Sequence, residues 1–227
     1  MSNVIIACDF SSSNELNKFL KNFKSNKPFL KIGYQLFYKI GRTGIQKLTK
    51  QGYKIFLDLK LHDIPNTVYE GVKSLSDLNI SMLTVHAAGG IEMMSKAKQA
   101  AGKKIKVLAV TQLTSTDKPM LKNELLISKD INQTILHYAT NAKKAGVDGV
   151  ICSPNEVKII KSKLNKSFLC VTPGIRYPDG NTNDQKRVAT PKAAKNFGSD
   201  YIVVGRPITK SDRPLNMYLK MSREFGK

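Results

Sequence analysis

Short apolar runs alternate with helical segments along the whole chain, and this alternation constrains the fold more than any other feature. Most of the runs are nearly continuous in Val, Ile, Leu and Phe, as expected for parallel strands that are covered on both faces. The eight runs are residues 4–9, 29–33, 54–60, 82–87, 106–113, 149–152, 168–173 and 201–206.

The segments between these runs have the signatures of helices. Ser13-Asn14-Glu15 precedes a stripe of apolar residues at spacings of three and four, and Asn66-Thr67 begins another such stripe. Residues 129–146 predict a third helix, for which Gly146 provides a natural C-terminal stop.

Strand and helix that alternate eight times predict a single (β/α)8 barrel of the TIM type over residues 1–227. A doubly wound open sheet is the alternative, but its first strand is normally followed by a Gly-rich turn. Here Ser11-Ser12-Ser13 follows that strand, which favours the barrel. No linker, repeat or low-complexity tract divides the chain, so we expect one domain.

The formal net charge of +20 at pH 7 indicates a strongly basic surface. Lys far outnumbers Arg and is spread over the whole chain. Nucleic-acid-binding proteins more often cluster their charge and use Arg for bidentate contacts. We therefore expect a solvated surface that attracts phosphorylated small molecules at long range, with no nucleic-acid partner.

Several features favour a cytoplasmic protein without a membrane partner. No apolar run reaches the roughly 18–20 residues that cross a bilayer. The N-terminus lacks the basic region of a signal peptide and predicts a first strand instead. Cys8, Cys152 and Cys170 match no zinc spacing and are expected to be small buried side chains in a reducing compartment.

The ends of the predicted strands carry charges that buried strands seldom tolerate. Asp9 ends the first strand, Lys31 lies in the second, and Asp58 and Lys60 lie near the end of the third. Because side chains alternate faces along a strand, Asp58 and Lys60 should point the same way, toward the barrel axis. Asp63 follows three residues later, in the loop.

Desolvated charges are costly unless they are paired, so these lysines and aspartates should form one network. A Lys between carboxylates stays protonated, which suits a proton donor better than a nucleophile or a Schiff base. A salt bridge that only fixes the register of the barrel is the alternative. The charges at other strand ends make it the weaker interpretation.

Other candidate residues are weaker when taken singly. Gly205-Arg206 fits a phosphate site at a strand end, or a plain turn with a surface Arg. His86 is expected to be structural, whereas the role of His62 stays open. The polar loop over residues 174–185 is long enough for a lid. No residue set has metal spacing, and a Lys beside Asp58 would repel a divalent ion, so no metal is expected.

At these positions the chain closely resembles the orotidine 5′-phosphate decarboxylase family, in its bacterial branch. The strongest match is the stretch Asp58-Leu59-Lys60-Leu61-His62-Asp63-Ile64-Pro65-Asn66-Thr67. The other matching motifs follow in order over nearly the whole chain and lie at residues 85–90, 110–116, 172–176, 184–191 and 201–206.

The resemblance implies a (β/α)8 barrel that converts orotidine 5′-monophosphate to uridine 5′-monophosphate, with no metal or organic cofactor. It also implies a homodimer whose active sites are shared between the subunits. In that scheme Lys60 protonates C6 of the pyrimidine as carbon dioxide leaves, and Asp58 lies near the departing carboxylate. Lys31 completes the charged network and binds ribose.

The same resemblance implies the residues that bind substrate. Asp63 and Thr67 would reach the neighbouring subunit's site and contact ribose there, and Ile64 between them matches a substrate-binding position. Asp9 would lie at the ribose and Thr114 at the pyrimidine edge. The remaining substrate-binding positions, at the phosphate and at the base of the lid, are Gln185, Gly205, Arg206 and Arg176.

Two other functional classes fit parts of the sequence. Related barrels that act on sugar phosphates, such as 3-keto-gulonate 6-phosphate decarboxylase and hexulose-phosphate synthase, share the Asp-x-Lys-x-x-Asp strand end. They bind Mg²⁺ and carry an acid at the second strand, where this chain has Lys31. A basic nucleic-acid-binding protein is the second alternative, and it predicts retention on duplex DNA with a steep salt dependence.

Overall fold

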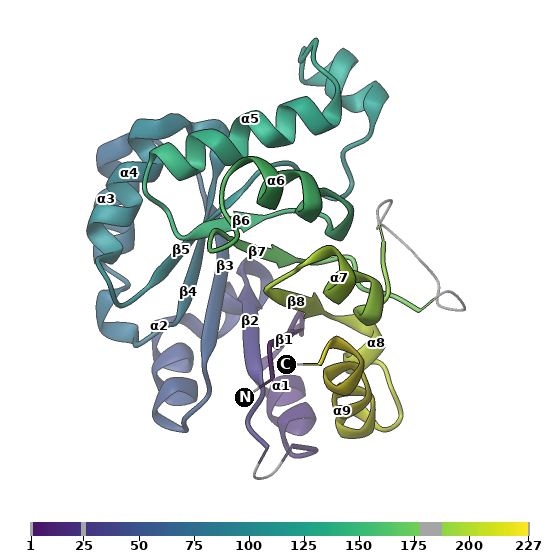
Figure 1. The fold of residues 1–227 in the computed structure, drawn as a ribbon. Coiled ribbons are helices and arrows are strands. Elements are labelled where there is room, and N and C mark those ends of the chain that lie inside the picture. The colour runs from purple at the N-terminus through teal and green to yellow at the C-terminus, as the bar shows by residue number, and fades with distance from the viewer. Residues whose placement is uncertain (1, 24–25, 178–187, 227) are drawn as a thin grey trace.

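A closed barrel of parallel strands forms the centre of the molecule, as Figure 1 shows for this computed structural model. The structure describes residues 2–23, 26–177 and 188–226. Within them, each of the eight strands pairs with its neighbours in the order of the sequence, and β8 pairs with β1. The strands are β1 (Val4–Ala7), β2 (Phe29–Gly33), β3 (Ile55–Leu61), β4 (Met82–His86), β5 (Lys106–Val110), β6 (Gly149–Ile151), β7 (Leu169–Thr172) and β8 (Tyr201–Val204). The predicted (β/α)8 fold is confirmed.

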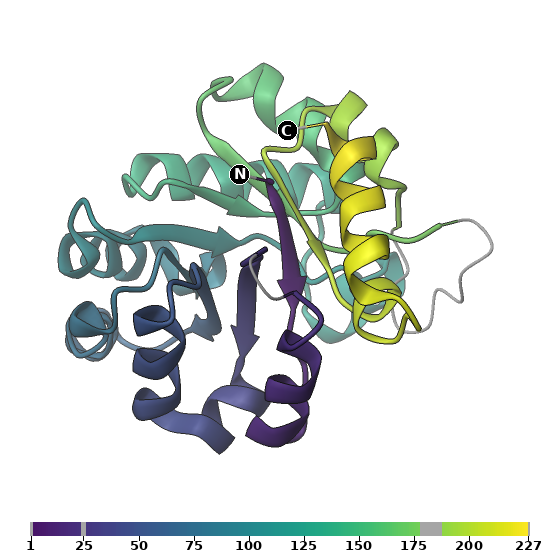
Figure 2. The ribbon, with the colours of Figure 1, turned by 90° about the horizontal axis from the view of Figure 1, so that it is seen from below.

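Helices between the strands cover the outside of the barrel (Figures 1 and 2). The α-helices are α1 (Ser13–Leu20), α2 (Tyr34–Lys50), α3 (Pro65–Lys73), α4 (Gly90–Ala101), α5 (Ile131–Lys144), α6 (Val157–Lys163), α7 (Pro191–Phe197), α8 (Arg206–Thr209) and α9 (Pro214–Phe225). Short turns of 3-10 or π helix are η1 (Ser76–Leu78), η2 (Ala87–Gly89), η3 (Met120–Glu124) and η4 (Pro154–Glu156).

Capping residues explain where the predicted helices begin. The Ser12 hydroxyl accepts the backbone N–H of Glu15, so α1 starts at Ser13. The third predicted helix starts two residues later than the sequence pattern suggested, because the Asp130 carboxylate caps α5. Gly146 follows the end of that helix with a φ of 78°, a conformation that favours glycine.

The barrel separates two apolar layers. Ile5, Ala7, Phe29 and Phe56 lie inside it with other inward-facing side chains, whereas Leu57 packs into the layer between strands and helices. Side chains thus alternate between the inside and the outside of the barrel, as the prediction for Asp58 and Lys60 requires. Inward-facing positions near the C-terminal strand ends are therefore where the charged side chains meet.

The opposite, N-terminal ends of the strands carry a different polar arrangement. Asp200 directly precedes β8, and its Oδ2 accepts the backbone N–H of Cys170 at 2.7 Å and Lys161 Nζ at 2.6 Å. Asp148 makes the corresponding contacts before β6, with one lysine and one backbone N–H. These carboxylates tie neighbouring strands and a helix together, far from the charged strand ends.

The first and last elements of the chain lie side by side. β1 pairs with β8, and the two chain ends lie close together in Figure 2. The Ser2 and Ser222 hydroxyls are 2.9 Å apart. No helix in the described part of the chain combines the length and the apolar character needed to cross a bilayer.

Candidate active site

A cavity of about 560 Å³ opens at the C-terminal ends of the strands. Strand parity and the strand-end loops bring most of the predicted site residues to its wall. Those that line it are Asp9, Lys31, Asp58, Lys60, Thr114, Arg176, Gly205 and Arg206. Residues that are up to about 200 positions apart in the chain therefore meet in one place.

Four charges form an alternating chain along one wall of the cavity. Lys31 Nζ lies 3.1 Å from Asp9 Oδ1 and 3.4 Å from Asp58 Oδ2. Lys60 Nζ lies 2.9 Å from the same Asp58 oxygen. The predicted network is thus present, with Asp58 between the two lysines.

The network keeps Asp58 and Lys31 charged despite their burial. Burial opposes ionisation of Asp58, but the nearby Lys31 and Lys60 ammonium groups outweigh it and lower the pKa of the carboxyl. Burial likewise opposes the charge of Lys31, and the Asp58 and Asp9 carboxylates outweigh it and raise the pKa of Lys31. Asp58 is therefore a carboxylate, and Lys31 an ammonium, at neutral pH.

A distortion of β3 sets the relation between Asp58 and Lys60. Leu57 pairs with Leu83 and Leu61 with Val85, so β3 contains two more residues than β4 over this stretch. Lys60 has a φ of 47°, which is uncommon for a residue other than glycine. The prediction that Asp58 and Lys60 face the same cavity is confirmed, but regular alternation alone does not produce their geometry.

Thr84 of β4 holds this distortion in place. Its hydroxyl accepts the backbone N–H of Lys60 at 2.9 Å and donates to Asp58 Oδ1 at 2.8 Å. Thr84 is fully buried. Thr84 was not predicted from the sequence, although a Thr inside an apolar strand is a signal that could have identified it.

Glycine at position 33 leaves room for the charged network. A Cβ atom there would lie 3.3 Å from Lys31 Nζ and 3.5 Å from Asp9 Oδ1. Gly33 also pairs with Asp58 across β2 and β3. A larger residue would therefore crowd two of the four charges.

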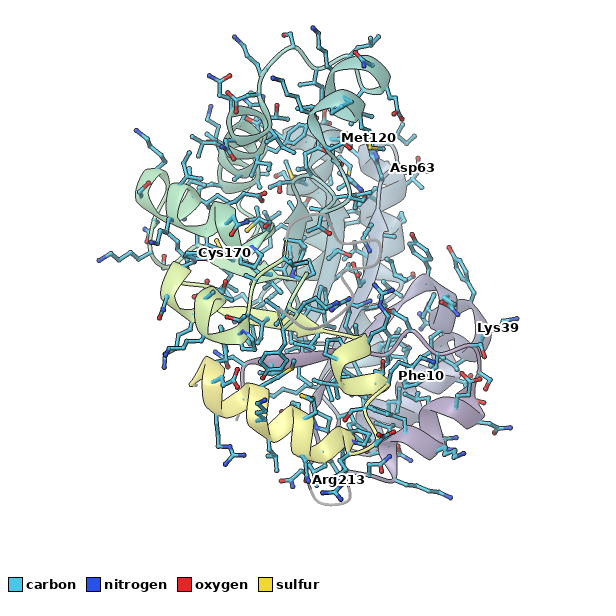
Figure 3. The ribbon with its side chains drawn as sticks, turned by 90° about the vertical axis from the view of Figure 1, so that its right-hand side faces the viewer. Phe10, Lys39, Asp63, Met120, Cys170 and Arg213 are labelled. Atoms are coloured by element: carbon cyan, nitrogen blue, oxygen red, sulfur yellow. The ribbon has the colours of Figure 1, made fainter. Side chains whose placement is uncertain are left out.

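Asp63, Ile64 and Thr67 lie elsewhere. The described residues that line the cavity do not include them, and all are exposed. Asp63 accepts the backbone N–H of Ile64 at 2.7 Å, at the start of α3. Figure 3 shows Asp63 at the surface, well apart from Phe10, which lines the cavity. The loop position predicted for Asp63 is confirmed.

The far side of the cavity is formed by the ends of β7 and β8. Gly205 and Arg206 begin α8 at the cavity wall. Arg176 is buried, and its side chain donates to the Ile175 carbonyl at 2.8 Å. The backbone N–H of Arg176 donates to the Ala189 carbonyl at 3.0 Å. This hydrogen bond joins the two ends of the loop after β7. Gln185 and most of the predicted lid lie outside the described residues.

Other polar side chains at the cavity were not predicted. Glu15 and Lys210 both line it. Glu15 accepts both the Ser11 hydroxyl, at 2.9 Å, and the Ser11 N–H, at 3.1 Å, and these hydrogen bonds lower the pKa of the Glu15 carboxyl. The strand-end pattern could not indicate them, because both lie within helical or loop segments.

The two histidines near β3 and β4 contact each other. The His62 and His86 rings stack with centroids 5.6 Å apart. Burial, followed by the charges of His62 and Lys60, lowers the pKa of His86. Neither ring lies among the described residues of the cavity wall. Over the described residues, no group of three or more His, Cys, Asp or Glu side chains is arranged to hold a metal ion.

The chain is similar to known proteins over nearly its whole length. A sequence profile of the orotidine 5′-phosphate decarboxylase / HUMPS family matches residues 2–221. The chain is 50% identical to orotidine 5′-phosphate decarboxylase of Staphylococcus saprophyticus, over 97% of each chain. It is 47% identical to the enzyme of that name from Streptococcus suis, over 98% of this chain and 97% of the other.

The chain is also similar to solved crystal structures. The crystal structure of orotidine 5′-phosphate decarboxylase from Lactobacillus acidophilus superposes with a TM-score of 0.90 at 46% identity, over 100% of both chains. A conserved protein from Geobacillus kaustophilus, described as uncharacterized, superposes with a TM-score of 0.88 at 42% identity, over 98% of this chain and 100% of the other.

Proposed function

The chain belongs to the orotidine 5′-phosphate decarboxylase / HUMPS family, and we propose that it decarboxylates orotidine 5′-monophosphate to uridine 5′-monophosphate in pyrimidine biosynthesis. The contact that carries the proposal is the one between Lys60 Nζ and Asp58 Oδ2, 2.9 Å apart at the wall of the cavity.

The reaction explains why a cation is needed at this position. When the bond between C6 and the carboxylate breaks, its electron pair stays on C6, where no conjugated group can accept it. A preorganised positive charge is the main means of stabilising such a centre. Lys60 supplies that charge and then transfers an ammonium proton to C6, which forms the new C–H bond. Solvent returns a proton to the neutral amine.

Asp58 and Lys31 complete the reacting end of the site. Asp58 holds the Lys60 ammonium and lies near the departing carboxylate, whose charge it disfavours in the ground state. Lys31 balances the Asp58 charge through their 3.4 Å contact. Lys31 and Asp9, 3.1 Å apart, are assigned to the ribose hydroxyls.

The remaining cavity residues are assigned to the base and the phosphate. Thr114 holds the pyrimidine edge, and Arg176 contacts the ligand near the loop that follows β7. Gly205 and Arg206 bind the phosphate together with Gln185. The phosphate is remote from C6, so its binding energy can serve to order the site for the chemical step.

Asp63, Ile64 and Thr67 are assigned to the active site of a second subunit in a homodimer. Their exposure supports this assignment, because Ile64 leaves 67% of its surface open in the single chain. The exposed Asp63 and Ile64 side chains are both accessible to a second subunit. Closing a two-fold interface over this region would place the Asp63 carboxylate near the partner's ribose.

The proposed reaction needs no metal or organic cofactor, since Lys60 supplies both the positive charge and the proton. We further propose that residues 1–227 form one domain and that the enzyme acts in the cytoplasm. Burial of Cys8, Cys152 and Cys170, none of which forms a disulfide within the described residues, is compatible with a reducing compartment. Closure of the barrel by β1 and β8 supports the single domain.

Incubation with orotidine 5′-monophosphate tests the function. The purified protein should release uridine 5′-monophosphate and CO₂, at an unchanged rate after treatment with a chelator. A parallel incubation supplies hexulose 6-phosphate and 3-keto-gulonate 6-phosphate with Mg²⁺. Turnover of these sugar phosphates, without turnover of the nucleotide, would assign the chain to the other branch of its family.

A further inference from the structure

An aromatic ring lies over the Lys60 ammonium. Lys60 Nζ is 5.5 Å from the centroid of the Tyr34 ring. That distance is within the roughly 6 Å over which the negative face of a ring attracts a cation. The Tyr34 ring also stacks on that of Tyr38, with centroids 6.3 Å apart and planes 24° apart.

The sheet register explains why this residue meets Lys60. Gly33 at the end of β2 pairs with Asp58 of β3, and α2 begins at the next residue, Tyr34. Lys60 lies two residues beyond Asp58 on the neighbouring strand. Tyr34 itself is absent from the described residues that line the cavity. Its contact with the charged network is the one with Lys60, so we consider its influence on the reaction through that residue.

The Tyr34 ring restrains the Lys60 ammonium without occupying its N–H donors, as a second carboxylate would. A lysine ammonium has three N–H donors on a flexible stem. Asp58 takes one of these donors, at 2.9 Å, and fixes the ammonium from one direction. A neutral ring attracts the cation without a full negative charge, so it does not compete strongly for the remaining N–H groups. One of them stays available for a carbon centre in the cavity.

We propose that Tyr34 is a positioning residue for Lys60, whose ring holds the protonated ammonium in the orientation from which it transfers a proton. This inference rests on the proposed function, in which Lys60 is the donor to C6. It gives the exposed aromatic side chain at the start of α2, which is 50% exposed in the single chain, a role in the chemical step.

Substitutions at Tyr34 and Tyr38 test the proposal with orotidine 5′-monophosphate as substrate. Tyr34→Leu removes the ring and should lower kcat by about five- to thirty-fold with KM changed by less than about two-fold. Tyr34→Phe keeps the ring and should retain kcat within about three-fold, and Tyr34→Trp should do at least as well. Tyr38→Leu is the control on the same helix: it removes the ring that stacks on Tyr34 but not the ring over Lys60, so its loss of kcat should be clearly smaller than that of Tyr34→Leu.

Two kinetic outcomes would overturn the proposal. One is a Tyr34→Leu variant with the kcat of the unmodified chain. The other is an equal loss in Tyr34→Leu and Tyr38→Leu, which would trace the effect to the exposed aromatic surface. Sedimentation and thermal unfolding of every variant separate a kinetic loss from a loss of assembly or folding.

A spectroscopic readout tests the contact even if the protein does not turn over the nucleotide. The chain contains no Trp, so Tyr34→Trp introduces a single indole fluorophore beside the ammonium. Adding Lys60→Met to that variant should change its emission, while adding Lys39→Met, a lysine elsewhere on α2, should not. Identical emission with and without the Lys60 ammonium would contradict the contact.

Discussion

The hydroxyl of Thr84 lies 2.8 Å from Asp58 Oδ1, and through this bond β4 fixes the central carboxylate of the charged network on β3. The Thr84 hydroxyl oxygen also accepts the backbone N–H of Lys60, whose φ of 47° is uncommon for a lysine. One buried hydroxyl thus stabilises both the carboxylate and the distorted backbone. The geometry of Asp58 and Lys60 depends on a residue that belongs to neither the strand nor the motif that carries them.

Thr84→Val tests this dependence. Valine has the same shape but leaves Asp58 Oδ1 and the Lys60 N–H without their partner, so the free energy of unfolding should fall by about 1–3 kcal/mol. Turnover of orotidine 5′-monophosphate should fall as well. Thr84→Ser keeps the hydroxyl and should retain most of both quantities. Equal urea-unfolding midpoints for Thr84→Val and the unmodified chain would refute the role assigned to Thr84.

Gly33→Ala tests the space around Lys31. The added methyl group would lie 3.3 Å from Lys31 Nζ, so the ammonium that contacts Asp9 and Asp58 must shift by a few tenths of an ångström. We expect a higher KM and a lower kcat, measured on orotidine 5′-monophosphate. Gly71→Ala is the control, since a Cβ in that α3 position meets nothing within 4 Å and should stabilise the helix by about 0.5–1 kcal/mol. Unchanged kinetics in Gly33→Ala would show that the network tolerates displacement of Lys31.

Acidification tests the charge state of Asp58. Its pKa lies below the ordinary value of 3.8, so ionised Asp58 stabilises the fold above that pH. This stabilisation is lost as the pH falls through the lowered pKa. Asp58→Asn removes it, so the unmodified chain should lose more stability than the variant between pH 5 and the acid limit of folding. Parallel loss in urea titrations of both proteins over that range would contradict the lowered pKa.

Asp200→Ala separates stability from activity. The substitution removes the acceptor of the Cys170 N–H and the carboxylate partner of Lys161, whose ammonium keeps its contact with the Lys166 carbonyl, at the end of the barrel opposite the cavity. The free energy of unfolding should fall by about 2–4 kcal/mol. At a temperature where the variant is folded, kcat should equal that of the unmodified chain. A large fall in kcat under those conditions would show that the two ends of the barrel are coupled.

Mixing two inactive variants tests the shared active site. Lys60→Ala lacks the proton donor, and Asp63→Ala lacks the residue assigned to the partner's site. If subunits exchange at random, half of the dimers are mixed and each has one complete site, so about a quarter of the full activity should return. Activity that stays at the level of the separate variants would place Asp63 outside the partner's site.

The sequence predicted the fold and the charged strand ends because both follow from local patterns. The apolar runs are strands, and parity along β3 correctly placed Asp58 and Lys60 on the inner face. Thr84 and Tyr34 were missed for a common reason. Their contacts with Lys60 depend on the register between neighbouring strands, which the extra residues in β3 shift. The Thr inside an apolar strand could have marked Thr84 as unusual, but not its contact with Lys60.

Single-turnover conversion of orotidine 5′-monophosphate by the unmodified chain and by Lys60→Ala is the most direct test of the central claim. With the enzyme in excess and uridine 5′-monophosphate binding measured in parallel, Lys60→Ala should still bind the product. Its rate of CO₂ release should fall by at least about a thousand-fold, as expected when a general acid and its charge are both removed. A Lys60→Ala variant that releases CO₂ at the rate of the unmodified chain would contradict the account.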